Sequence, residues 1–401
     1  MAEAPPKALH QTEFIALIAM LFATIAFSID AMLPALPRIA AELSPGSPNT
    51  AQLIITSFVL GMGLGTFVAG PLSDAFGRRT VIVGGAALYS LAALVAWVAP
   101  SLETLLLARV VQGLGAAGPR VVTLALVRDL YQGRQMARVV SFAMMIFTIV
   151  PAAAPLLGTF IIADFGWRGI FLAFVLFSGL SMLWFLLRQP ETLLPADRRP
   201  LRLAALWDAL REVLAHRVIQ ISIAVQTLVF AALFAMISST QQIFDVTYGR
   251  DASFPYWFAA IALLAGSASL VNAAIVVRLG MRRIVTATMA LQIALSGGMA
   301  LMTGFGLWPE ALAFPAYLVW TTGVFFMAGL TLGNLNALAL EPVGHIAGMA
   351  ASVTGAIATV GSVALAAPLG LAFDGTPVPL AMGIAVLSVL GYVLMRAMPG
   401  R

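Results

Sequence analysis

Long apolar stretches alternate with short polar ones along almost the whole chain. Each apolar stretch holds roughly 20 residues, and as a helix it is long enough to cross a hydrocarbon core of about 30 Å. The pattern predicts twelve such spans, at residues 14–36, 51–73, 80–99, 103–126, 138–163, 168–188, 218–243, 254–277, 283–305, 312–339, 347–372 and 378–396. We therefore expect an all-α membrane protein.

The longest polar segment, residues 189–217, separates the sixth span from the seventh. It contains three prolines and several arginines, and we expect it to be a cytoplasmic linker between halves 1–188 and 218–401. The two halves also echo each other, because residues 278–283 follow the second span of their half as residues 75–79 do in theirs. Internal repetition of this kind indicates two pseudo-symmetric six-helix bundles that meet along a central axis.

Composition and charge agree with a membrane location. Hydrophobic residues make up 61% of the chain and charged residues 10%, with a mean hydropathy of +0.99, which excludes a water-soluble domain. With the N-terminus in the cytoplasm, seventeen basic residues fall on the cytoplasmic side and only Arg38, Arg168 and Arg250 outside. The positive-inside rule then places both termini in the cytoplasm, and the net charge of +5 reflects orientation in the membrane and not nucleic-acid binding.

The sequence offers no pattern for an enzyme. The chain has no cysteine, and its histidines His10, His216 and His345 lie in tails or loops. No metal-ligand cluster, Ser–His pair or soluble catalytic domain is found, and no GxxxxGK[ST] loop that would bind ATP. We expect no enzymatic activity, no cofactor and no metal; a membrane enzyme or sensor is a distant alternative.

Ionisable residues well inside the spans are costly and usually functional, and only Asp30, Arg109 and Arg120 lie there. Asp30 and Arg109 each lie roughly six residues from the outer ends of their spans, at a shared depth of ~9 Å, so they can pair if the two helices are neighbours. Burial and a nearby guanidinium act in opposite directions on the pKa of a carboxyl group. Asp30 is thus a candidate proton carrier; the alternative is a static ion pair or a helix cap before Pro34.

Arg120 and the fifth span allow two interpretations each. Arg120 either lines the cytoplasmic half of a cavity, bonding to Asn334, Asn336 or Glu341, or extends to the inner surface. In the fifth span, Pro151, Pro155 and Gly158 indicate a bend and a tight helix contact, or a simple kink.

The turn after the second span collects charge at the cytoplasmic surface. Asp74 lies between Gly70 and Gly77, which permit the turn, and Arg78 and Arg79 follow it. With Asp129 from the end of the fourth span, the predicted set is Gly70, Asp74, Gly77, Arg78, Arg79 and Asp129. A conformational latch is one interpretation of this set, and an ordinary re-entry loop with basic anchors is the other.

These motifs resemble a known transporter family. Residues 70–79 (GPLSDAFGRR) resemble the loop signature of the major facilitator superfamily, and residues 109–117 (RVVQGLGAA) resemble the fourth-span signature of its twelve-span drug:proton antiporters. Residues 151–158 resemble the fifth-span antiporter motif, although Pro151 and Thr159 stand where glycines are usual. Residues 28–37, 127–131 and 167–171 are similar to the Bcr/CflA type of drug-resistance transporter.

The resemblance implies alternating access, in which two six-helix halves rock about a central site and export a small molecule while protons enter. It implies that Asp74, Arg78 and Asp129 form a charge relay that stabilises the outward-facing state, and that Arg109 and Asp30 serve proton coupling. Val277 stands where a second Asp74 would be, so the resemblance does not extend to a second latch.

We therefore expect a multi-pass protein of the bacterial inner membrane that exports small lipophilic drugs, driven by the proton gradient, without nucleic-acid partners and as a monomer. An exporter dedicated to an amino acid, siderophore or sugar is the alternative. The substrate cavity is expected between spans 1, 4, 7 and 10, lined by Asp30, Arg109, Arg120, Gln226, Phe230, Phe234, Gln241, Asn334 and Asn336.

Overall fold

The computed structural model describes residues 9–198, 200–201 and 203–399, and every regular element within these ranges is helical. The predicted fold class is confirmed on these residues. Four of the basic residues used for the orientation prediction lie outside the described residues: Lys7, Arg199, Arg202 and Arg401.

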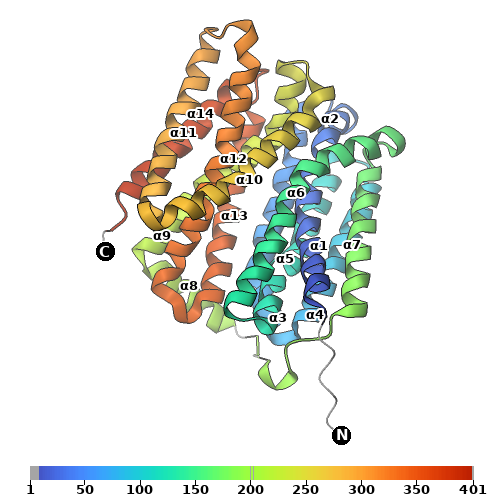
Figure 1. The fold of residues 1–401 in the computed structure, drawn as a ribbon. Coiled ribbons are helices and arrows are strands. Elements are labelled where there is room, and N and C mark those ends of the chain that lie inside the picture. The colour runs from blue at the N-terminus through green and yellow to red at the C-terminus, as the bar shows by residue number, and fades with distance from the viewer. Residues whose placement is uncertain (1–8, 199, 202, 400–401) are drawn as a thin grey trace.

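The first half contains the helices α1 (Gln11–Asp30), α2 (Leu36–Leu43), α3 (Leu53–Phe76), α4 (Arg78–Trp97), α5 (Leu102–Leu130), α6 (Gly133–Phe165) and α7 (Gly169–Arg188), with short 3-10 turns at Leu33–Ala35 and Pro48–Gln52. The second half contains α9 (Arg217–Gln242), α10 (Phe254–Leu279), α11 (Met281–Gly304), α12 (Glu310–Leu340), α13 (Ala347–Leu371) and α14 (Val378–Arg396). A π-helical turn, Ile243–Thr247, extends α9. The two halves stand side by side, one blue to green and the other yellow to red (Figure 1).

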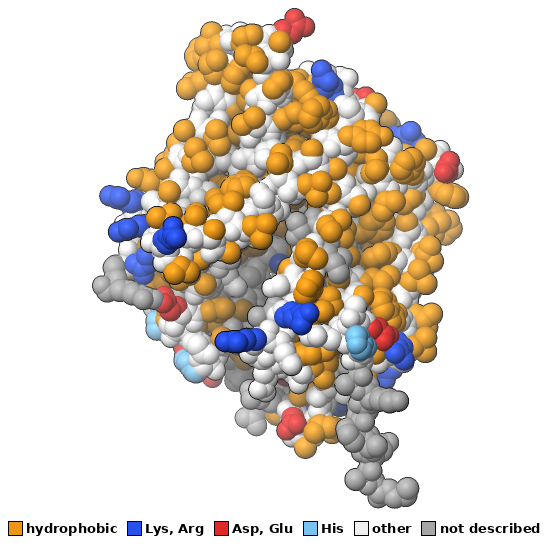
Figure 2. Space-filling view, in the orientation of Figure 1, with side chains coloured by type: hydrophobic (Ala, Val, Ile, Leu, Met, Phe, Trp, Pro, Cys, Tyr) orange, Lys and Arg blue, Asp and Glu red, His pale blue; other side chains and the backbone are white. Residues whose placement is uncertain are grey.

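Twelve helices of the described chain are suited to cross a membrane, as predicted. Eleven continuous segments are long and apolar enough, and the longest, Glu310–Leu371, holds two helices. These are α12 and α13, which separate at Val343, where φ is −125° and ψ 37°. Apolar side chains cover the middle of the molecule, and charged ones gather toward its ends (Figure 2).

Helix packing repeats between the halves. In the first half α5 packs against α3 and α4, and α7 packs against α4; in the second half α12 packs against α10 and α11, and α14 against α11. The pair α1–α6 likewise corresponds to α9–α13. Between the halves, α3 contacts α13 and α6 contacts α10, which is again one contact and its symmetry equivalent. The repeat that the sequence suggested is therefore present in the packing.

The two echoing turns have the same backbone conformation. Gly77 ends α3 with φ 101°, and Gly280 ends α10 with φ 81°, a region that favours glycine. In both halves this glycine is followed at once by a helix that carries two arginines in its first turn. The similarity of the two sequence segments therefore reflects a shared turn.

The segment predicted only as a linker has structure of its own. Residues Leu203–Ala215 form the helix α8, which packs against α9 and α13. The sequence analysis missed this helix because the prolines and arginines of the segment suggested an extended connection.

Close packing of α3 on α5 depends on glycine. A Cβ atom on Gly113 would lie 2.0 Å from the carbonyl oxygen of Phe58, and one on Gly61 would lie 1.9 Å from that of Val110. Since both obstacles are backbone atoms, the helices would have to separate to admit a side chain.

We predict that Gly113→Ala lowers the free energy of unfolding by about 1–3 kcal/mol, the usual cost of overpacking. Thermal unfolding in detergent measures the change. Gly179→Ala is the matched control, because no atom lies within 4 Å of a Cβ at that position. Equal midpoints for the two variants would contradict the prediction.

Candidate functional site

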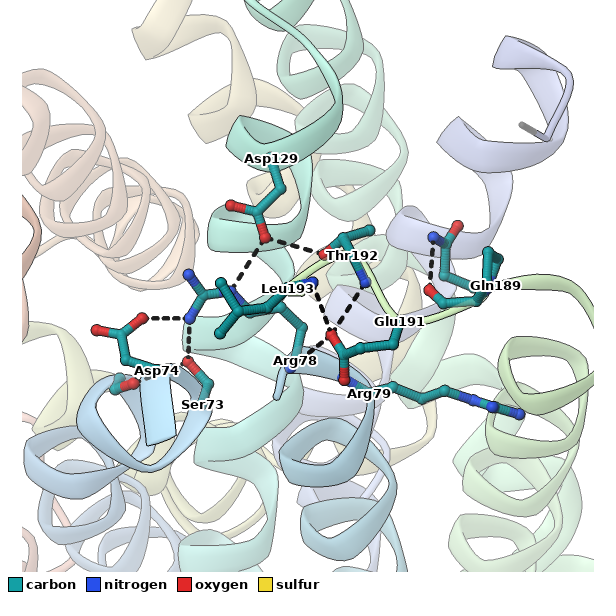
Figure 3. Close-up of polar contacts among 11 residues, drawn as sticks. Ser73, Asp74, Arg78, Arg79, Asp129, Gln189, Glu191, Thr192 and Leu193 are labelled. Atoms are coloured by element: carbon teal, nitrogen blue, oxygen red, sulfur yellow. Dashed lines mark hydrogen bonds and ion pairs between the residues drawn. The ribbon is translucent and has the colours of Figure 1, made fainter. Parts of the chain in front are cut away.

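The predicted latch is centred on Arg78, whose side chain is buried between α3 and α5. Its Nε donates to Asp129 Oδ2 at 3.1 Å, and one terminal nitrogen donates to Ser73 Oγ at 2.8 Å and to Asp74 Oδ1. Hydrogen bonds between ionised groups are roughly twice as strong as neutral ones. The structure thus brings together Asp74, Arg78 and Asp129, and it adds Ser73 (Figure 3).

A carboxylate from the linker completes the latch. Glu191 Oε1 accepts from the backbone nitrogen of Arg78 at 2.9 Å, and Oε2 accepts from that of Arg79 at 3.1 Å (Figure 3). It therefore satisfies the first free N–H groups of α4, which has no capping side chain of its own. Thr192 Oγ1 donates to Asp129 Oδ2 at 2.9 Å, so one carboxylate joins the linker to Arg78.

The remaining predicted latch residues have separate roles. Arg79 points away from the acids and donates to the carbonyl oxygen of Leu186 at 2.7 Å, near the end of α7. Gly77 leaves room for the linker, since a Cβ there would lie 2.3 Å from Glu191 Oε2. Gly70 faces the second half, where a Cβ would lie 3.4 Å from the Ser352 hydroxyl.

A cavity of about 640 Å³ opens beside the latch, between the two halves. Its walls include the latch acids Asp74 and Asp129 with Arg78 and Arg128, and across from them the start of α13 around Gly348 and Ser352. We call this the latch end of the molecule. It is the end at which the sequence predicts the cytoplasm.

Arg109 is fully buried in α5, and its hydrogen bonds and ring contacts with the described residues all lie inside the first half. Its nitrogens donate to the carbonyl oxygens of Ile54 at 3.2 Å and Ser28 at 3.0 Å, and to Gln112 Oε1 at 2.7 Å. The guanidinium also lies 4.4 Å from the centre of the Phe58 ring. Arg109 therefore ties α5 to α1 and α3.

Asp30 is 5% exposed at the end of α1, and its side chain has no hydrogen bond or ion pair with any described residue. The ion pair that the sequence suggested between Asp30 and Arg109 is thus not formed in this conformation. Arg109 reaches α1 close to Asp30, where it donates to the carbonyl of Ser28, but its three hydrogen bonds go to two backbone oxygens and an amide and not to the carboxyl group.

The fifth-span motif lies directly against α1. Pro151 and Pro155 are inside the continuous helix α6, and Gly158 approaches α1 so closely that a Cβ would be 2.3 Å from the carbonyl oxygen of Ala31. The predicted tight contact is therefore a contact with the residue that follows Asp30.

The other residues predicted to line a central cavity lie in different surroundings. Gln226 and Gln241 are buried in α9, and each has one amide atom without a hydrogen-bond partner among the described residues. Phe230 stacks on Phe234 with ring centres 5.7 Å apart. That these four side chains, together with Asp30 and Arg109, contact the substrate stays a prediction.

Two of the predicted cavity residues on α12 do not share one environment. Asn334 turns toward α10, where its Nδ2 donates to Asn272 Oδ1 at 2.7 Å and to the carbonyl of Leu330 at 2.8 Å. Asn336 is exposed, and the half-buried Arg120 forms no hydrogen bond with a described residue of α12. None of the nine predicted cavity residues lines the cavity at the latch end.

At the opposite end, side-chain amides join the halves. Gln52 Nε2 donates to Gln242 Oε1 at 2.6 Å, and Gln242 Nε2 donates to Asn49 Oδ1 at 2.7 Å. Ser239 donates to Gln52 Oε1 at 2.8 Å, and Asn49 donates to the carbonyls of Leu371 and Phe373. We call the set Asn49, Gln52, Ser239 and Gln242 the amide ladder. Because it joins 3-10 residues before α3 to α9 and α13, this ladder end is closed.

The sequence analysis missed both Glu191 and the amide ladder. Glu191 lies 113 positions from Arg78, and Gln52 lies 190 positions from Gln242, so neither pair has a local pattern. The one available signal was the presence of amide residues at the outer ends of the second and seventh spans.

Comparisons with known proteins agree on one family. The family model for the Major Facilitator Superfamily matches residues 16–370. The chain is similar to a bicyclomycin resistance protein homolog of Haemophilus influenzae, with 30% identity over 388 residues, 92% of this chain and 93% of that protein. It is also similar to the multidrug resistance protein MdtL of Escherichia coli, with 27% identity over 93% of this chain and 92% of that protein.

A chloramphenicol resistance protein of Pseudomonas aeruginosa is 37% identical over 156 residues, which cover 39% of this chain and 36% of that protein. Among solved structures, a D-xylose-proton symporter superposes with a TM-score of 0.76 at 13% identity, covering 96% of this chain and 98% of that one. An inward-open xylose transporter from E. coli superposes with a TM-score of 0.72 at 12% identity, covering 98% and 97%. At these identities the structural likeness concerns the fold alone.

We predict that Glu191→Ala releases the linker from the latch. Losing hydrogen bonds to a charged acceptor costs about 1.5–3 kcal/mol, so trypsin should cut after the exposed Arg198 about tenfold faster or more. Asp208→Ala removes an exposed carboxylate from α8 and is the matched control. Unchanged cleavage in Glu191→Ala would show that the cap does not hold the linker.

We predict that Gln52→Leu loosens the ladder end. A thiol introduced at the buried Ala51 position should react about tenfold faster. This corresponds to a decrease of ~1.4 kcal/mol in the free energy that favours the closed ladder end over the open one. Gln292→Leu is the control, because Gln292 is equally buried but bonds to Ser296 within one helix. The same maleimide labelling rate in both backgrounds would contradict a closing role for the ladder.

Proposed function

The chain belongs to the major facilitator superfamily of membrane transporters, and on that basis we propose that it is a proton-coupled antiporter that exports small lipophilic drugs. The observation that carries proton coupling is Asp30, a buried carboxyl group inside a membrane span without a partner among the described residues. An unpaired buried carboxylate is costly as an anion. Exchange of a proton at this position therefore depends on whether water or a counter-ion reaches it.

Arg109 supports this role from a fixed position. Its three hydrogen bonds and the Phe58 ring hold the guanidinium beside the last turns of α1 without neutralising Asp30. We infer that Arg109 keeps its positive charge throughout, and that a movement of α1 relative to α5 changes the distance between this charge and Asp30. Coupling then follows from geometry that differs between conformations.

The two ends of the molecule support alternating access. Hydrogen bonds between the halves join the ladder end, whereas the larger cavity between the halves, of about 640 Å³ against about 370 Å³, lies at the latch end. We infer that in this conformation the protein takes up cargo from the latch end. We propose that the latch end is cytoplasmic and that both termini lie on that side. In the opposite state the ladder separates and the latch end closes on α13.

The proposed cargo is small and lipophilic. Support comes from the relatives named for resistance to bicyclomycin, to chloramphenicol and to multiple drugs. The stacked rings of Phe230 and Phe234 on α9 would provide an apolar contact for such a molecule. We propose further that the protein works as a monomer in the bacterial inner membrane, in halves 1–188 and 218–401, without a cofactor.

We predict that Asp30→Asn abolishes transport driven by an imposed pH gradient in liposomes, while exchange of labelled for unlabelled cargo without a gradient continues. The amide keeps the shape of the carboxyl group but carries no exchangeable charge. Glu103→Gln, an exposed acid at the start of α5, is the control and should behave as the wild type. Undiminished gradient-driven transport by Asp30→Asn would exclude Asp30 as the proton carrier.

A further inference from the structure

A second cavity, of about 370 Å³, lies at the ladder end and is not used in the proposed transport route. Both halves line it. The first half contributes the residues around α2 and the turn before α3: Leu36, Pro37, Ala40, Ala41, Pro45, Pro48, Ala51 and Gln52. The second half contributes Ser238, Gln242, Asp245 and Val246 from α9 and the π-helical turn that extends it.

The lining is apolar apart from two amides, a hydroxyl and one carboxyl group. Gln52 and Gln242 use their amides in the ladder, and Ser238 donates to the carbonyl of Ala235. The carboxyl group of Asp245 is half-buried and has no hydrogen bond or ion pair with a described residue. It is therefore the polar group of this cavity that is available to a ligand.

Charges around Asp245 favour a cation. Asp251 lies close enough to act on it electrostatically and adds a second negative charge. The neighbouring arginines are engaged elsewhere: the guanidinium of Arg250 lies 4.5 Å from the centre of the Phe314 ring, and Arg38 donates to the carbonyl of Ile162. Apolar walls with one unpaired negative group suit an apolar molecule with a single positive charge.

We propose that this cavity is an outer binding site for an amphiphilic organic monocation, and that the bound cation holds the ladder end closed. The effect follows from the lining, because separation of the halves would take the apolar wall around α2 away from Asp245. A ligand that binds one conformation only shifts the equilibrium toward that conformation. The cation therefore slows transport from the ladder end without competing for the cargo site.

Binding itself does not depend on the proposed function, whereas the slowing of transport rests on it. The first test uses tetraphenylphosphonium as the probe and the purified full-length protein in detergent. Asp30→Asn removes the buried acid of the central route, so a loss of binding caused by a further change in this background does not arise from Asp30. We expect the Asp30→Asn protein to bind the probe, and the further change Asp245→Asn to weaken binding about tenfold, or ~1.4 kcal/mol.

Asp251→Asn in the same background is the matched control, because it removes one negative charge from the same end outside the cavity lining. Its effect should be clearly smaller than that of Asp245→Asn. Equal weakening by the two changes would assign binding to general surface charge and overturn the proposal. Loss of all binding in Asp30→Asn alone would assign the probe to the central route, which overturns the proposal but leaves the proposed function standing.

A second test does not require Asp30→Asn to fold. The chain has no cysteine, so a single introduced thiol reports one position. The exposed Ala41 lines the cavity, and the exposed Ala252 lies at the same end outside it. We expect tetraphenylphosphonium to slow maleimide labelling of Ala41→Cys at least about fivefold and to leave labelling of Ala252→Cys unaffected. The reason is that the labelling rate falls in proportion to the fraction of cavities that the probe occupies, so a nearly saturated site blocks the thiol.

Absence of protection at Ala41→Cys while the probe binds would overturn the proposed location. If the protection is seen but external probe does not slow cargo export from liposomes, the claim that the cation holds the ladder end closed fails while the site remains. Loss of export in the absence of any probe would instead count against the proposed function.

Discussion

Burial of charge in a low-dielectric interior is the constraint on which the rest of this structure depends. An ion inside a bilayer needs partners, because no water is present to replace them. Arg109 meets this requirement with two backbone carbonyls, an amide and an aromatic face, and in doing so it joins three helices. Asp30 does not meet it, although it lies only two residues from the carbonyl that Arg109 binds. Of these two buried groups, only the carboxyl group of Asp30 is therefore left with an uncompensated cost of burying its charge.

The polar contacts at the two ends of the molecule differ in chemistry. At the latch end the contacts are ionic and lie within the first half, with the linker laid across them. At the ladder end the contacts are neutral amides and run between the halves. Neutral hydrogen bonds contribute about 0.5–1.5 kcal/mol each after exchange with water, so a few of them can close an end and still open in a transport cycle.

Sequence reasoning predicted most of the fold, because twelve apolar stretches of membrane length leave few arrangements and the glycines at positions 77 and 280 mark equivalent turns. It also grouped Asp74, Arg78 and Asp129 correctly, since all three lie at helix ends on one side of the membrane. It placed Arg79 with the acids, whereas that side chain reaches the end of α7. Glu191 and the ladder were out of reach, because their partners are more than a hundred residues away and only the folded arrangement brings them together. Asn334 shows the same limit, since a polar residue on a span can face a neighbouring helix as easily as a central axis.

The contact between Gly158 and Ala31 has a mechanical consequence. No side chain separates α6 from α1 at this point, so there is no flexible layer that could absorb a displacement of the segment carrying Asp30. The same helix α6 also packs on α10 of the other half. A displacement of the segment that carries Asp30 therefore requires α6 to move at Gly158, and because α6 also contacts α10, such a movement reaches the boundary between the halves.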